Sequence, residues 1–159
     1  MDLGHVGKDM TVNIGGIEGG GKTTNVVPEH CVLIGEIRAF SHEKALTQME
    51  EIKALFESEA KKVGGRCKIK SEVSYKAYRV EENHSSVCRF RRACKKMGLP
   101  GTIEKTFGGS DQANLAVHGI QGLVLASAME KVHSCQEYTS VSEMERLKEL
   151  IKLLMQDPE

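Results

Sequence analysis

The feature that most limits the fold is a glycine-rich stretch between two β-branched runs near the N-terminus. Residues 10–17 (MTVNIGGI) and 30–38 (HCVLIGEIR) are rich in Val and Ile, which favour strands. Glycines fill much of Glu18–Asn25, and Pro28 prevents a helix from starting there. We therefore expect two strands joined by a glycine-rich loop, the second strand being well buried because of its continuous apolar run.

A long helix is expected next. Ser41 is a suitable N-cap, and Gly64-Gly65 are suited to end a helix. Cys67–Tyr75 then alternates with period two, which predicts a third strand. The first half thus predicts an antiparallel sheet with a covering helix. The residues expected on the buried face of that helix are Ala45, Met49, Ile52, Phe56 and Val63.

The second half alternates helical and strand-like segments, which is typical of α/β structure. A polar linker at Tyr78–Asn83 indicates a change of unit, so we expect domains at residues 1–83 and 84–159. The last helix is predicted to begin with a capping box formed by Ser140 and Glu143. The other expected elements are a helix opened by Ser85 or Ser86, strands at 102–107 and 120–126, a short helix at 111–117 and a loop at 129–138.

The amino-acid composition excludes some classes of binding partner for this chain. The 22 Lys and Arg balance the 22 Asp and Glu, so a neutral chain has no electrostatic attraction to nucleic acid or to an anionic membrane. No apolar run approaches the roughly 20 residues of a membrane span. Five cysteines, an odd number without a CxxC pair, favour reduced thiols. We therefore expect a cytoplasmic protein with neither nucleic acid nor membrane as a partner.

One motif suggests a different function. Gly16–Thr23 matches the phosphate-binding pattern G-x-x-x-x-G-K-[ST], including Lys22. A true phosphate loop needs a helix directly after the Lys-Thr pair, and Pro28 opposes one here. Glu18 inside the loop would also repel phosphate. Nucleotide binding is therefore kept only as an alternative.

Several short motifs in register carry a resemblance to a known family. They are Asn25-Val-Val-Pro28, Glu36-Ile-Arg38, Tyr75-Lys-Ala-Tyr78, Gly108-Gly-Ser-Asp111 and Met129-Glu-Lys-Val-His133. In this order and spacing the chain, from about Met10 to Leu154, resembles the peptidase T-like branch of the dinuclear zinc aminopeptidases. Relatives of that branch are carboxypeptidase G, aminoacylase and succinyl-diaminopimelate desuccinylase. The resemblance implies an α+β chain: a partial ferredoxin-like lid and dimerisation domain, followed by the closing α/β segment of a zinc-peptidase catalytic domain.

The resemblance also implies roles for particular residues. His133 would ligate one of two zinc ions, which together activate water and polarise a scissile carbonyl. Arg38 would hold the terminal carboxylate of a short peptide substrate, and Asn25 would stabilise a developing oxyanion. Gly108, Gly109 and Ser110 would let the peptide backbone approach closely.

Each of these residues has a plainer interpretation. His133 could be an ordinary loop histidine, Arg38 could pair with Glu36 or another acid, and Asn25 could be a turn residue. Residues 108–110 could be a simple turn into a helix, with Ser110 or Asp111 as its cap. Gln112 stands where many relatives have a small residue, which would alter the pocket wall.

The chain lacks most of the family's catalytic groups. It has no His-x-Asp pair, and neither Glu50-Glu51 nor Glu81-Glu82 has the glycine context of the general base. One ligand cannot hold two metals. We therefore expect a fragment or half of a peptidase, inactive alone, that forms a homodimer through its lid. The alternative is a non-catalytic dimerisation module. The incomplete lid also predicts self-association through a sheet edge, or disorder near residues 1–9.

Overall fold

The structure is a computed structural model that describes residues 1–21, 23–126 and 128–156. The chain divides into two compact units, Met1–Ala77 and Tyr78–Glu159. The helices and strands are β1 (Gly4–Val6), β2 (Met10–Gly19), β3 (Cys31–Ala39), α1 (His42–Lys62), α2 (Ser85–Lys96), α3 (Gln112–Val117), β4 (Met129–Glu130), β5 (Tyr138–Thr139) and α4 (Val141–Gln156). The observed mixture of helices and small sheets agrees with the predicted α+β class.

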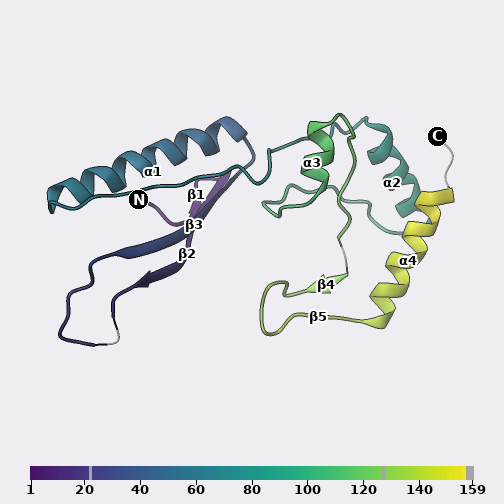
Figure 1. Ribbon diagram of the computed structural model, residues 1–159. Helices are drawn as coiled ribbons and strands as arrows, with labels where there is room; N and C mark the ends of the chain where they lie inside the picture. Colours follow the sequence, from purple (N-terminus) through teal and green to yellow (C-terminus); the bar gives the residue numbers. More distant parts are fainter. Residues whose placement is uncertain (22, 127, 157–159) are drawn as a thin grey trace. The chain divides into compact units, whose positions relative to one another are not determined.

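The first unit is an antiparallel sheet of order β1-β2-β3 with α1 packed against it (Figure 1). Met10 and Val12 on β2 are buried together with Ile52 on α1. Val6, Ile37, Ala39 and Phe56 pack around them. The predicted helix face is thus confirmed at Ile52 and Phe56, but Val63 lies beyond the end of the helix and is exposed.

Ser41 caps α1 as predicted. Its hydroxyl accepts a hydrogen bond from the Lys44 amide at 3.4 Å. At the other end Gly64 has a φ of 70°, and the Gly65 amide donates to the Ala60 carbonyl. A left-handed residue there satisfies carbonyls that the last turn leaves open, which explains the paired glycines.

The expectation that the second strand is well buried is wrong. Residues 31–36 of β3 are exposed, and Ile34 retains 64% of its exposure. The core cluster reaches only Ile37 and Ala39 on this strand, so the outer part of the β2–β3 hairpin extends past its cover. A continuous apolar run favours burial, but it does not identify the element that would bury it.

Three predicted strands are not strands in the structure. Cys67–Tyr75, residues 102–107 and residues 120–126 have no ladder partner among the residues that the structure describes. One expectation errs in the opposite direction, since the predicted loop at 129–138 includes strands of the β4–β5 hairpin. Of the two alternatives for the N-terminus, disorder is not observed, because β1 pairs with β2, and self-association stays a prediction.

The second unit has a core between α2 and α4. Ala93, Cys94 and Leu150 are buried together, with Phe90, Met97, Leu99, Leu153 and Leu154 around them. Burial raises the pKa of the Cys94 thiol. His84 caps α2 in place of the predicted serines, since the Ser86 amide donates to its Nδ1 at 3.3 Å. No described helix is long and apolar enough to cross a membrane.

A register shift between Ile14 and Gly16 places Gly35 in close contact with the neighbouring strand. A Cβ atom at Gly35 would lie 2.6 Å from the Asn13 carbonyl oxygen, which is backbone and cannot swing aside. The strand therefore needs glycine at this position for steric reasons.

We predict that Gly35→Ala lowers the free energy of unfolding by about 1–3 kcal/mol, because the hairpin must shift to admit the methyl group. The matched control is Gly16→Ala, whose Cβ would meet Ile34 at an ordinary 3.5 Å. Urea unfolding of both variants measures the difference, and equal midpoints would contradict the proposed clash.

Candidate functional site

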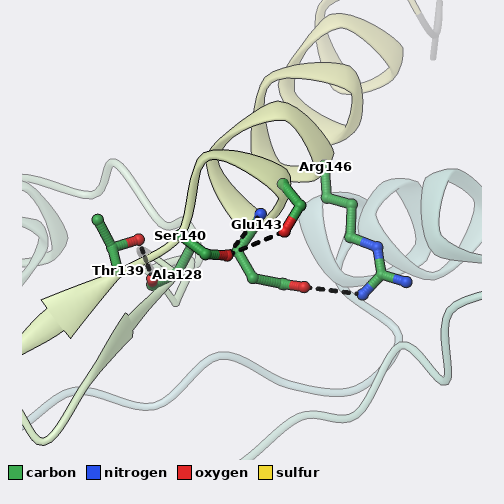
Figure 2. A network of polar contacts seen from close by, with 6 residues as sticks. Ala128, Thr139, Ser140, Glu143 and Arg146 are labelled. Carbon is green, nitrogen blue, oxygen red and sulfur yellow. Dashed lines mark hydrogen bonds and ion pairs between the residues drawn. The ribbon is translucent and has the colours of Figure 1, made fainter.

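His133 lies in the seven-residue loop between β4 and β5. Glu130 pairs with Tyr138 at the base of this loop, and the Thr139 hydroxyl donates to the Ala128 carbonyl beside it. The next residue, Ser140, accepts the Glu143 amide at 3.2 Å and so caps α4 (Figure 2). This confirms the predicted helix start, with Arg146 bonded to the Glu143 carboxylate. The loop that carries His133 is thus followed, after the two residues of β5, by a capped helix.

The backbone around His133 is left-handed at several residues. Ala128, Lys131 and His133 have φ values of 57°, 51° and 63°. They are the residues other than glycine with positive φ in the part of the chain that the structure describes. Each such conformation costs on the order of 1–3 kcal/mol and clusters at functional sites in proteins. None of the three is Gly, Asn or Asp, the residues that most readily adopt this conformation, so their sequence does not predict it.

Hydrogen bonds within the loop oppose that cost. The His133 amide donates to Glu137 Oε2 at 2.7 Å, and the Ser134 hydroxyl donates to the Lys131 carbonyl at 2.7 Å. The Lys131 ammonium donates to Gln136 Oε1 at 3.0 Å. In the sequence, Cys135 and Glu137 form a His-x-Cys-x-Glu pattern with His133 that is too small for a metal site and favours a structural role, and the bond to the His133 amide gives Glu137 such a role.

The turn at 108–110 leads into α3. Ser110 accepts the Gln112 amide on its hydroxyl at 3.1 Å and the Ala113 amide on its carbonyl. Gly108 donates to the Thr106 hydroxyl at 2.9 Å. Of the two caps considered, Ser110 is the one observed, since Asp111 makes no side-chain cap bond. The plain interpretation of this turn is therefore realised in the structure.

Gln112 connects α3 to the segment that follows it. Its amide nitrogen donates to the Ile120 carbonyl at 2.8 Å, and its side chain packs against Gly122. Gln112 was expected to alter a pocket wall, but in the structure it links α3 to residues 120–122 of the same unit.

Arg38 and Asn25 belong to the first unit. Arg38 makes a two-point ion pair with Glu36, with distances of 2.9 and 3.0 Å. The ion pair considered as its alternative is thus present. Asn25 lies in an exposed turn at the end of the β2–β3 hairpin.

The phosphate-loop geometry is not formed. Residues 16–19 continue β2 and pair with residues 31–34, so the strand runs through the first half of the motif at 16–23. The next helix begins at His42, which confirms that no helix follows the motif among the described residues. Lys22 itself lies outside the described residues.

Among the described residues, no group of three or more His, Cys, Asp or Glu side chains could hold a metal ion. His133 offers one imidazole, and the carboxylate of Glu137 accepts a backbone amide. The residues that the structure describes therefore do not by themselves fit a metal ion.

Comparison with known proteins shows which families and structures the chain resembles. Residues 3–64 match the family model described as a peptidase dimerisation domain, of the M20 type. The protein YqjE of Bacillus subtilis is 31% identical over 157 residues, which are 99% of this chain and 42% of the relative. The chain thus spans about two-fifths of the curated relative that it matches.

Two solved structures are similar over 97% of this chain and 41% of their own. The aminopeptidase PepT from Bacillus cereus has 32% identity and a TM-score of 0.80. A tripeptidase from Staphylococcus aureus has 28% identity and a TM-score of 0.88. Most of the first unit is therefore similar to M20-type peptidase dimerisation domains. The chain as a whole resembles the C-terminal part of peptidase T-like aminopeptidases, which confirms the family predicted from its motifs.

We predict that Gln112→Ala lowers the free energy of unfolding by about 1 kcal/mol, because the Ile120 carbonyl loses its donor. Gln121→Ala, an exposed neighbour, is the control and is expected to stay within about 0.5 kcal/mol of the parent. The measurement is urea unfolding, and equal losses in the two variants would rule out a specific tie.

Proposed function

We propose that this chain is part of a zinc-dependent peptidase that hydrolyses short peptides, with His133 as a ligand to one of two metal ions. The observation that carries the proposal is its similarity, over nearly the whole chain, to an aminopeptidase and a tripeptidase. The exposed His133, on a loop held by its own hydrogen bonds, is in a suitable place for a ligand.

The proposal requires residues beyond this chain. The described residues do not complete a metal site, so no catalytic step is assigned to them. This chain matches about two-fifths of the Bacillus cereus aminopeptidase. The proposal therefore requires the remaining part of such an enzyme to supply the other metal ligands and the general base. The expected cytoplasmic location belongs to this proposal, and the free cysteines are compatible with it.

Substrate binding is proposed for Asn25, Arg38, Gly108, Gly109 and Ser110. The Arg38–Glu36 pair is exposed, and exposed pairs contribute roughly 0–1 kcal/mol. A peptide carboxylate could therefore replace Glu36 at low cost. Gly108 and Gly109 have no side chains, which would let a peptide backbone approach the turn closely.

We also propose that the first unit mediates homodimer formation. The match to a dimerisation domain covers most of it. β1 pairs with residues 10–12, so among the described residues the outer edge of β2 has no ladder partner from Asn13 onward. Ile17 on this part of β2 is 74% exposed. An unpaired edge with exposed apolar side chains is suited to pairing with a second chain.

We predict that Ile17→Lys weakens dimerisation at least about tenfold, because a lysine on an edge strand opposes pairing with another chain. Met155→Lys, an exposed apolar residue on α4, is the control and is expected to leave the dimer unchanged. Sedimentation velocity over a concentration series measures the dissociation constant. A monomeric parent chain at all concentrations would contradict dimerisation.

The peptidase proposal is tested by supplying the absent part. The chain is co-expressed with the portion of the Bacillus cereus aminopeptidase that it does not match, and tripeptide hydrolysis and bound zinc are measured. We expect hydrolysis by the assembly, and a loss of at least about 100-fold in His133→Ala, since loss of even an outer-shell partner costs 10–100-fold.

His118→Ala, an exposed histidine at the end of α3, is the control and is expected to retain activity and zinc. Full zinc content in the His133→Ala assembly would contradict the ligand role. A stable dimer that never hydrolyses peptides in any assembly would instead favour the non-catalytic dimerisation module.

A further inference from the structure

We propose that Glu137 is a positioning residue that holds the His133 backbone in the left-handed conformation in which the imidazole is presented. The inference deepens the proposed function and rests on it for the part that concerns metal binding. The part that concerns the backbone stands on this chain alone.

The first step of the argument is the conformation itself. Histidine has a Cβ atom, so a φ of 63° is disfavoured unless something holds the residue there. Lys131, two residues earlier, is also left-handed. A loop with two such residues in three positions would relax if it had no internal support.

The second step is the contact that supplies the support. The Glu137 carboxylate accepts the His133 amide at 2.7 Å, the short distance expected of a bond to a charged acceptor. The Glu137 amide donates in turn to the Ser134 carbonyl at 3.1 Å. Glu137 therefore closes the loop with both its side chain and its backbone, and the side-chain bond ends at His133 itself.

The third step excludes the other polar groups of the loop. Lys131, Ser134 and Gln136 bond to one another, and none of these bonds reaches the His133 backbone. Among the side-chain contacts described for the loop, the one from Glu137 alone acts directly on the residue whose placement matters.

The test begins with the full chain labelled with nitrogen-15. In Glu137→Ala the His133 amide loses its acceptor, so its hydrogen exchange should accelerate by at least about tenfold and its proton resonance should shift upfield. Glu137→Gln keeps an acceptor oxygen and should restore most of the protection. Glu130→Gln, the same change of charge at the base of the loop, is the matched control and should leave the amide unchanged.

Unchanged exchange and resonance in Glu137→Ala would overturn the inference. The variant His133→Ala separates the two claims, because it keeps the backbone amide and removes the imidazole. Amide protection at position 133 should persist in it, and loss of that protection would also count against the inference.

The second readout is zinc affinity of the assembled enzyme, measured by competition with a chelator. Glu137→Ala should weaken it about 10–100-fold, with recovery in Glu137→Gln. If His133→Ala binds zinc normally, the proposed function fails while the backbone role of Glu137 stands. If His133→Ala loses zinc and Glu137→Ala does not, the positioning role fails while the ligand stands.

Discussion

A β-strand is completed by a neighbour, because its backbone N–H and C=O groups need partners along the whole edge. In this chain, sheets form where a segment has another strand to pair with. β2 finds β3 through a hairpin and β1 over a short stretch. Residues 67–75 and 102–107 have the composition of strands, yet they have no ladder partner in the described structure. The solved structures that the chain resembles are more than twice as long, and strand partners for these segments are to be expected in such longer chains.

Local determinants of structure were predictable. The start of α1 at Ser41, the helix at Gln112–Val117 and the capping of α4 by Ser140 all depend on bonds within a few residues. Such features can be predicted from the sequence because they depend only on nearby residues. The long hairpin was also predicted, since both strands and their connection lie within one stretch.

Non-local features were not predictable. Whether Ile34 is buried depends on what lies across the sheet, and the sequence of β3 contains no information about that. The candidate site shows the same division. His133 was identified through its motif and a structural role for Glu137 through its spacing, whereas the left-handed backbone was not, because none of the three left-handed residues is Gly, Asn or Asp. The ion pair of Arg38 with Glu36 was foreseeable because the two residues are neighbours on one face of a strand.

The register shift in β2 has a consequence for the far end of the hairpin. An extra residue in one strand bends it and increases its twist, so everything beyond the irregularity leaves in a new direction. Asn25 lies at the end of this arm, many residues from Gly35. The bulge therefore helps to set the direction in which the outer hairpin extends, so the placement of Asn25 depends on a backbone irregularity distant from it in the strand.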